Sequence, residues 1–282
     1  MTVLEVIQRS SDFLAKKGVD SPRLHIELLL AHVLKLPRLR LYLNFERPLA
    51  EPELAVLREL VKRRANREPL QHILGHTSFC GLEFGVSPHA LIPRPETELL
   101  AEHAAKFLAT LPAPTALDFG TGTGCLAVTL AVQCPAASLH ALDISEAALA
   151  LARLNAARHQ VETRIAFHHG DGFAALPGTA RFDLIVSNPP YIATAEIETL
   201  QPEVRDFDPR LALDGGADGL DFYHRLAADT AAFLAPGGKV MLEFGDGQDD
   251  AIGKIFSSQN WIVEAVLADY SGRNRIFIAR RG

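Results

Sequence analysis

The sequence predicts an α/β protein with a mostly parallel sheet of seven strands wound by helices on both faces. Strand-like and helical patterns alternate from residue 115 to 282, and this alternation is typical of a doubly wound sheet. Residues 1–75 contain helical patterns and no strand pattern. A stretch rich in glycine and phenylalanine lies between these segments. We therefore expect an amino-terminal helical domain at 1–75, a linker at 76–94 and a larger domain at 95–282.

The amino-terminal segment has the pattern of a small helical bundle. Apolar residues recur at helical spacing in its first helix, and Gly18 supplies a C-terminal stop. Ser21 followed by Pro22 predicts an N-cap and a first helical position. We expect helices at residues 3–17, 22–35 and 51–67.

The linker has the pattern of a β-hairpin. Bulky apolar residues alternate there with polar residues and glycines, as in short paired strands: Phe79, Gly81, Leu82, Phe84, Gly85 and Val86. The segment Arg94–Glu98 then introduces a helix that continues through Leu108.

The remaining residues supply the sheet and its covering helices. We expect strands at 115–119, 138–143, 164–168, 183–187, 238–244, 261–267 and 274–280. Helices are expected near 124–133, 145–159, 220–235 and 248–258. Because only a short turn separates the last two strands, they should pair antiparallel.

Charge and cysteine content narrow the class of protein. The formal net charge of −6 divides into +4 over residues 1–75 and −10 over the rest. A basic segment that includes Lys62, Arg63 and Arg64 predicts a docking surface for a partner, although a solvated helix face would look the same. Three cysteines without a C-x-x-C pair favour reduced thiols in a cytosol. No apolar stretch is long enough to cross a bilayer.

Asn188-Pro189-Pro190-Tyr191 is an unusual way for a chain to leave a buried strand. Proline fixes φ and donates no hydrogen bond, and Pro190 restricts Pro189 to an extended conformation. The segment is therefore stiff, and it holds the Asn188 side-chain amide and the Pro189 carbonyl in a fixed relation. We interpret their oxygens as an acceptor pair for an NH2 group, which leaves amides and nucleobases equally open as substrates. The alternative is a rigid strand exit that only ends pairing.

A glycine-rich loop, residues 118–124, follows the first strand of the sheet and opens a helix. Its alternating glycines permit positive φ and a close approach of ligand to backbone. Asp143 ends the next strand, nineteen residues after Gly124, where a carboxylate can bind ribose hydroxyls. This arrangement predicts a cofactor that contains adenosine, and a tight turn without ligand is the alternative.

Two acidic residues favour S-adenosylmethionine over a nicotinamide cofactor, although Gly122, Gly124 and Ala127 also satisfy the nicotinamide pattern G-x-G-x-x-A. Asp118 would repel a pyrophosphate, but it suits the ammonium of a methionine moiety. Asp171 follows the third strand, where a polar side chain can reach the adenine amino group. The expected cofactor-binding residues are Asp118, Gly120, Thr121, Gly122, Thr123, Gly124, Asp143, Asp171 and Gly172.

The chain resembles class I S-adenosylmethionine-dependent methyltransferases with a Rossmann-like sheet, and more narrowly the HemK/PrmC family of protein-(glutamine-N5) methyltransferases. The resemblance covers essentially the whole chain. Asn188–Tyr191 alone is shared with adenine-N6 DNA methyltransferases and some ribosomal RNA guanine methyltransferases. The more specific marks are Leu91–Glu98, the glycine loop, Gly215–Leu220, Leu242–Gly245 and Asp269–Arg275.

This resemblance implies a substrate and a set of roles. The substrate would be the glutamine of a Gly-Gly-Gln loop in peptide chain release factors, methylated on its side-chain nitrogen. The catalytic and substrate-binding residues would be Asn188, Pro189, Pro190 and Tyr191, and Asn188 would also face the cofactor. Many members carry tryptophan where this chain has Gly172, so Phe173 is expected to contact the adenine in its place.

Three rival functions stay open at this point. An adenine-N6 or guanine-N2 nucleic-acid methyltransferase would use the same acceptor pair, but it needs a positive groove. A nucleotide-binding sensor has no use for an amide acceptor, and an NAD-dependent oxidoreductase would need an acid for its hydride relay. If the chain is instead a glutamine methyltransferase, as the resemblance implies, we expect release factors as its partners and no stable nucleic-acid binding. We also expect no membrane or metal site, and a monomer in the cytoplasm.

Overall fold

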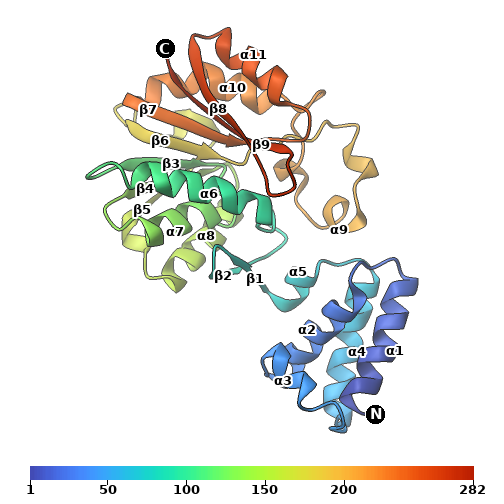
Figure 1. Cartoon of the computed structure of the whole chain (residues 1–282). Coiled ribbons are helices and arrows are strands. Elements are labelled where there is room, and N and C mark those ends of the chain that lie inside the picture. The colour runs from blue at the N-terminus through green and yellow to red at the C-terminus, as the bar shows by residue number, and fades with distance from the viewer. The chain divides into compact units, whose positions relative to one another are not determined.

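The computed structural model describes residues 1–282, which divide into two compact units (Figure 1). The amino-terminal unit contains Met1–His76 together with Gln201–Phe207. The carboxy-terminal unit contains Thr77–Leu200 and Asp208–Gly282. The sequence places residues 201–207 in the larger domain, whereas the structure groups them with the helical unit.

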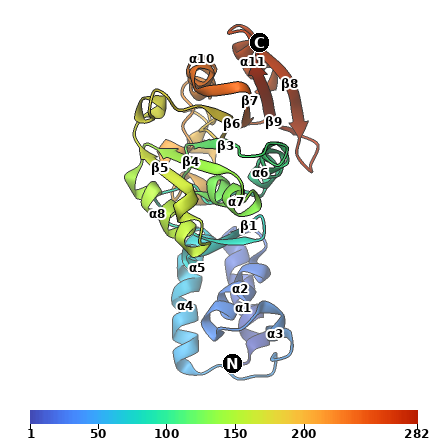
Figure 2. The same cartoon turned by 90° about the vertical axis from the view of Figure 1, so that its left-hand side faces the viewer.

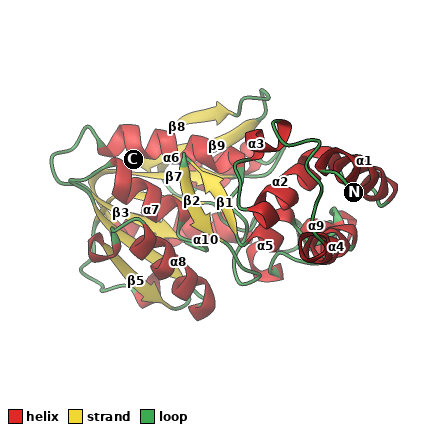
Figure 3. Ribbon diagram, turned by 90° about the horizontal axis from the view of Figure 1, so that it is seen from below, coloured by secondary structure: helices red, strands yellow, loops and turns green.

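The amino-terminal unit is built from helices, without a strand among them (Figure 3). Leucine, isoleucine and valine side chains from several helices form one buried core; Leu14, Ile26, Leu29 and Leu30 are fully buried in it. Two of these helices have only five residues each and were not predicted, because a segment this short cannot show helical periodicity. The helices are α1 (Val3–Lys16), α2 (Pro22–Leu34), α3 (Arg38–Tyr42), α4 (Glu51–Ala65), α5 (Leu70–Leu74) and α9 (Pro202–Arg205).

The start of α2 differs in detail from the prediction. The helix begins at Pro22, but Ser21 has φ +48° and its side chain makes no capping hydrogen bond. Ser21 thus occupies the predicted N-cap position but supplies no side-chain cap, since a residue in the left-handed region does not aim its hydroxyl at the first turn. Gly18, with φ +72°, lies just past the end of α1 as expected.

An ion-pair cluster explains why residues 201–207 belong to the helical unit. Glu203 accepts hydrogen bonds from Arg64 Nη2 at 2.6 Å and from Arg67 Nε and Nη2 at 2.7 and 2.6 Å. Although burial opposes ionisation, these guanidinium partners hold the pKa of Glu203 at about 2. The Glu203 carboxylate thus ties α9 to α4.

The same cluster removes one residue of the basic run Lys62–Arg64 from the predicted docking surface. The Arg64 residue is only 3% exposed, because its guanidinium is bound to Glu203. Arg63 pairs with Glu68, and Lys62 pairs with Glu59. Arg64 is therefore not available to a partner protein, whereas Lys62 and Arg63 keep exposed side chains within their ion pairs.

The carboxy-terminal unit contains a seven-stranded sheet with the order β5-β4-β3-β6-β7-β9-β8. The first five strands in this order run parallel, and β9 pairs antiparallel with both β7 and β8, which confirms the predicted sheet. A separate two-stranded sheet joins β1 (His76–Phe79) and β2 (Leu82–Gly85). The strands of the large sheet are β3 (Thr115–Phe119), β4 (Ser138–Asp143), β5 (Ile165–His169), β6 (Phe182–Ser187), β7 (Leu234–Glu243), β8 (Trp261–Ala268) and β9 (Asn274–Arg281).

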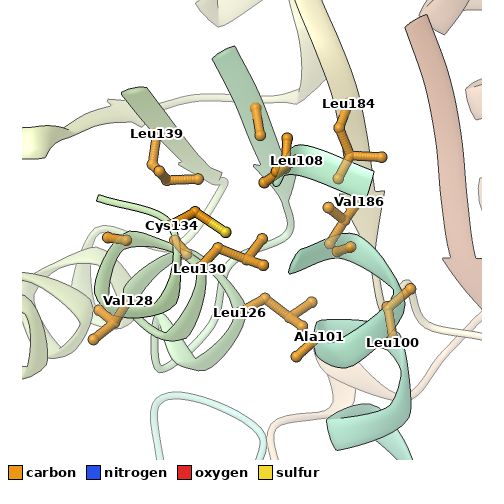
Figure 4. Packing of buried hydrophobic residues seen from close by; sticks show 14 of the residues in the cluster. Leu100, Ala101, Leu108, Leu126, Val128, Leu130, Cys134, Leu139, Leu184 and Val186 are labelled. Atoms are coloured by element: carbon orange, nitrogen blue, oxygen red, sulfur yellow. The ribbon is translucent and has the colours of Figure 1, made fainter. Parts of the chain in front are cut away.

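Helices cover both faces of this sheet (Figure 2). On one face, Leu126 and Leu130 of a helix lie in one core with the strand residues Leu184 and Val186 (Figure 4). On the other face, Ile185 lies in a second core with the side chains of the last two helices. The covering helices are α6 (Pro95–Leu108), α7 (Cys125–Gln133) and α8 (Glu146–Arg158) on the first face, and α10 (Asp221–Asp229) and α11 (Asp249–Ser257) on the second.

No helix in the chain combines the length and the apolar character that a membrane span requires.

Candidate active site

A pocket opens at the carboxyl ends of the parallel strands, where β3, β4 and β6 leave the sheet. Ligands of open α/β sheets bind at this edge, because the loops that follow the strands leave a crevice there. The pocket belongs entirely to the carboxy-terminal unit. Most of the predicted site residues line it: Asp118, Gly120, Thr121, Gly122, Thr123, Asp143, Asp171, Gly172, Asn188 and Pro190.

The glycine loop adopts the backbone that its sequence predicted. Gly120, Gly122 and Gly124 have φ of +75°, +55° and +80°. A Cβ on Gly120 would meet nothing within 4 Å and one on Gly122 would only touch Ala90, so there positive φ alone favours glycine. Gly124 differs, because its Cβ would lie 3.0 Å from Ala152 Cβ of α8. Gly124 therefore permits helix packing and does not line the pocket.

Asp118 presents one unpartnered carboxylate oxygen in this pocket. Its Oδ2 accepts hydrogen bonds from Thr121 Oγ1 at 2.6 Å and from the Ala127 amide at 3.1 Å. Its Oδ1 is buried and has no hydrogen-bond partner. Burial raises the pKa of Asp118 to about 7, although its two hydrogen bonds act in the opposite direction. A buried carboxylate without a counter-charge is a natural site for a cation.

Asp143 is the last residue of β4 and Asp171 lies on the loop after β5, and both line the pocket. The Asp143 carboxylate accepts from the Gly122 amide at 2.8 Å and from the Ser145 amide at 2.9 Å. A carboxylate offers about four lone-pair positions, so Asp143 keeps capacity for a pair of hydroxyl donors. Asp171 forms an ion pair with Arg225 of α10 at 2.5 Å.

Phe173 does not take the place that the family resemblance implied. Its residue is only 4% exposed, and its ring packs against Phe119 and Phe233 at centroid distances of 5.0 and 4.9 Å. Phe173 is therefore part of the core below the pocket and does not line it. The space beside Gly172 holds the Arg225 guanidinium, since a Cβ on Gly172 would lie 2.1 Å from Arg225 Nη2.

The segment Asn188–Tyr191 starts from a fixed anchor at the end of β6. Ser187 is fully buried, and its hydroxyl donates to the Phe119 carbonyl at 2.6 Å, which ties this strand end to that of β3. Asn188 and Pro190 line the pocket, whereas Pro189 and Tyr191 do not. The Pro189 carbonyl receives no hydrogen bond from the chain. Burial raises the pKa of Tyr191 to about 12, so its phenol stays protonated.

The glycine segment Gly215–Leu220 packs directly on this motif. A Cβ on Gly215 would lie 2.9 Å from the Pro190 carbonyl oxygen, and one on Gly219 would lie 2.3 Å from that of Tyr191. The backbones of Ile192 and Leu213 are also hydrogen-bonded at 3.0 Å. Glycine is required here because the two backbones touch.

We expect Gly219→Ala to destabilise the protein much more than its matched control, Gly247→Ala. Both residues have similar positive φ, +78° and +75°, so each substitution carries a backbone cost of roughly 1–2 kcal/mol. Only Gly219 adds a clash, since Gly247 has no atom within 4 Å of a new Cβ, and overpacking adds roughly 1–3 kcal/mol. Urea denaturation of both variants measures the difference. Equal losses in the free energy of unfolding would contradict the contact.

Sequence patterns alone did not identify several residues of the pocket as functional. Arg94 lines it and pairs at 2.5 Å with Asp208, whose side chain is fully buried. Arg225 had no signal in the sequence, whereas Arg94 and Thr97 lie inside the quoted Leu91–Glu98 segment. The other unpredicted lining residues include Ile144, Leu211 and Phe222.

Two family models match the chain. The model described as the PrmC N-terminal domain matches residues 5–75, and the methyltransferase small domain matches residues 95–204.

Curated relatives are similar over essentially the full length. The release factor glutamine methyltransferase of Geobacter sulfurreducens is 47% identical, with 100% of this chain and 97% of the relative covered. The protein of the same name from Chlorobaculum tepidum is 43% identical, with 97% and 95% covered.

Solved structures agree in fold at low sequence identity. The hMettl16 catalytic domain in complex with the MAT2A 3′UTR hairpin 6 gives a TM-score of 0.57 at 15% identity, covering 78% of this chain and 81% of that one. A methyltransferase from Pyrococcus furiosus gives 0.53 at 20% identity, covering 78% and 98%. At these identities the likeness concerns the methyltransferase fold alone.

Proposed function

We propose how the pocket performs the reaction of the release factor glutamine methyltransferase family, to which the chain belongs. The chain methylates the side-chain amide nitrogen of a glutamine in peptide chain release factors, with S-adenosylmethionine as the methyl donor. Within those factors we propose the glutamine of the Gly-Gly-Gln motif. The observation that carries the mechanism is the hydrogen bond between Asn188 Nδ2 and Thr97 Oγ1 at 3.1 Å.

The pocket residues fit the chemical groups of this cofactor. The unpartnered Asp118 Oδ1 suits an α-ammonium, and the open lone pairs of Asp143 suit ribose hydroxyls. The positive-φ backbone at Gly120 and Gly122 lets a ligand lie close to the main chain. When bound, S-adenosylmethionine supplies a methyl group on a sulfonium, whose leaving group is a neutral thioether.

Asn188 and Pro189 would orient the substrate amide. Because Asn188 Nδ2 is bound to Thr97, its Oδ1 is left free to accept a hydrogen bond. The Pro189 carbonyl has no partner in the chain and is the second acceptor. Two acceptors facing one NH2 group hold the nitrogen in a single orientation and stabilise the positive charge that develops on it.

The reaction needs no basic side chain. S-adenosylmethionine would supply the methyl group and a thioether leaving group that needs no protonation, so the chain's own residues need only hold the amide nitrogen in place. The nitrogen then loses one proton to water, because a protonated N-methyl amide is a strong acid. Tyr191 is no base for this proton, since burial keeps its phenol neutral with a pKa of about 12. The role we propose for Tyr191 is to pack beside the substrate amide, outside the cofactor pocket that Asn188 and Pro190 line.

A substrate-competition assay tests this function against its rival. Labelled methyl transfer is measured with a full-length release factor, a short Gly-Gly-Gln peptide, DNA and ribosomal RNA offered in parallel. We expect label in the release factor and none in the nucleic acids, since residues 76–282 carry net negative charge. Label in adenine or guanine instead would support the nucleic-acid methyltransferase.

The same assay addresses the amino-terminal unit as a docking domain. We propose that this unit contacts the release factor away from the reacting loop, which predicts a lower KM for the whole factor than for the peptide. Equal KM values would remove the docking role. We further propose a monomer that acts in the cytoplasm without stable nucleic-acid binding, and light scattering with and without ribosomal RNA measures both properties.

A further inference from the structure

The side chain of Asn188 is held by a residue outside its own motif. Thr97 lies in the first turn of α6 and is 2% exposed. Its hydroxyl oxygen is 3.1 Å from Asn188 Nδ2, in a contact that joins residues 91 positions apart in sequence. No other hydrogen bond of the Asn188 side chain is present, so Thr97 is its single protein partner.

Thr97 is in turn held by a buried carboxylate. Glu243 ends β7, is 1% exposed, and lies close enough to the Thr97 hydroxyl for hydrogen bonding by Thr97 to lower the pKa of its carboxyl. Its Oε2 is buried without any hydrogen-bond partner. The nearby guanidinium groups of Arg275 and Arg94 lower the pKa of Glu243, whereas the Glu96 carboxylate raises it. Side chains from α6, β7 and β9 thus meet behind Asn188.

A hydroxyl has one proton, and this determines the orientation of the Asn188 amide. An ionised carboxylate only accepts hydrogen bonds, so the Thr97 proton is committed to Glu243. The Thr97 oxygen can then only accept from Asn188, which requires the NH2 end of the amide to face it. The Asn188 Oδ1 is left pointing away as an acceptor. With the opposite rotation, two NH2 groups would face each other when a substrate amide binds.

We propose that Thr97, oriented by Glu243, is the positioning residue that sets the side-chain amide of Asn188 with its oxygen toward the substrate. This inference rests on the proposed function, in which Asn188 Oδ1 accepts from the substrate NH2 group. Thr97 touches neither of the reacting atoms and acts only through Asn188.

Burial raises the pKa of Glu243 to about 7, although its hydrogen bond to Thr97 lowers it. A neutral Glu243 could donate to Thr97 and release the Thr97 proton. The decisive measurements therefore belong at pH 8, where the Glu243 side chain is ionised.

The test is a double-mutant cycle on the full chain with a release factor as substrate. Thr97→Val keeps the shape and removes the hydroxyl, and Thr97→Ser is the matched control that retains it. We expect Thr97→Val to lower kcat by roughly 10–100-fold, as misorientation of a substrate-positioning group does, while the Kd of S-adenosylmethionine stays within about threefold. Thr97→Ser should retain kcat within about threefold.

In the Asn188→Ala background, Thr97→Val should cause no further loss, because residues that act as one unit are not additive. A second tenfold loss there, or wild-type kcat in the folded Thr97→Val single variant, would overturn the proposal. Thr97→Ala replaces the valine variant throughout if the latter does not reach a wild-type melting temperature. Wild-type turnover in Asn188→Ala alone would refute the proposed function itself, whereas a slow Asn188→Ala beside a fast Thr97→Val refutes only the positioning role.

Discussion

Asn188→Ala is expected to lower kcat for release factor methylation by roughly 10²–10³-fold, the usual cost of removing one preorganised polar group from a transition-state site. The alanine removes the oxygen that accepts from the substrate NH2 group. The hydrogen bond to Thr97 is lost as well, but the strand end stays anchored through Ser187 and Phe119. The Kd of S-adenosylmethionine should therefore change by less than about threefold. Single-turnover methylation and calorimetric titration measure the two quantities.

Asn188→Asp is the isosteric companion to this variant. It keeps the acceptor oxygen but replaces the NH2 group that binds Thr97 by a second carboxylate oxygen, close to the buried Glu243. We expect a large loss of turnover here also, because position and charge are both wrong. Turnover at the wild-type level in the alanine variant would remove Asn188 from the mechanism.

The affinity for S-adenosylmethionine is expected to rise by about tenfold between pH 6 and pH 8 and to level off above that. The pKa of Asp118 is raised to about 7, so below this value the carboxyl is neutral and does not attract an ammonium. Asp118→Asn should weaken binding at pH 8 by roughly 30-fold, as the loss of one partner of a buried charge pair does. It should also abolish the pH dependence.

The free energy of unfolding of the unliganded protein should change with pH in the opposite direction and decrease as pH rises. A carboxyl whose pKa is higher in the folded than in the unfolded chain binds its proton more tightly when folded. The stabilisation from Asp118 is fully present below its ordinary value of 3.8 and is lost as pH rises through about 7. Glu243→Gln and His89→Asn are the controls, since Glu243 has a pKa near the same value and His89 lines the pocket. We assign the pH dependence of the free energy of unfolding to Asp118. A dependence that disappears in either control and persists in Asp118→Asn would contradict this assignment.

Local patterns predicted the sheet well. The bounds of β3 and β4 agree with prediction, since apolar runs ended by glycine or acidic residues are unambiguous. The start of β7 was placed four residues late, at 238, because Gly237 and Gly238 look like a loop. Ser21 stands at the N-cap position and its residue type suits a cap, but its φ of +48° leaves the helix without a side-chain cap.

The candidate site was predictable where a residue acts through its own backbone neighbourhood. Asp118 lies near the end of β3, the glycine loop and Asn188 directly follow strands, and parallel strands bring their carboxyl ends together. The position of the Phe173 ring was not predictable in this way, because the direction in which the ring points depends on the core around it. Arg225 was missed for the same reason, since it reaches the pocket from a helix whose own pattern carries no signal.

By itself the sequence determined the order of strands and helices, the stiff Asn188–Tyr191 exit and the acidic residues that follow the strands. These properties depend on periodicity and on the backbone chemistry of glycine and proline, which act over a few residues. Only the tertiary structure decided that Glu203 closes on Arg64 and Arg67, and that Thr97 and Glu243 meet behind Asn188. Such contacts join residues 91 to 146 positions apart and depend on a single buried proton or charge, so no local pattern in the chain encodes them.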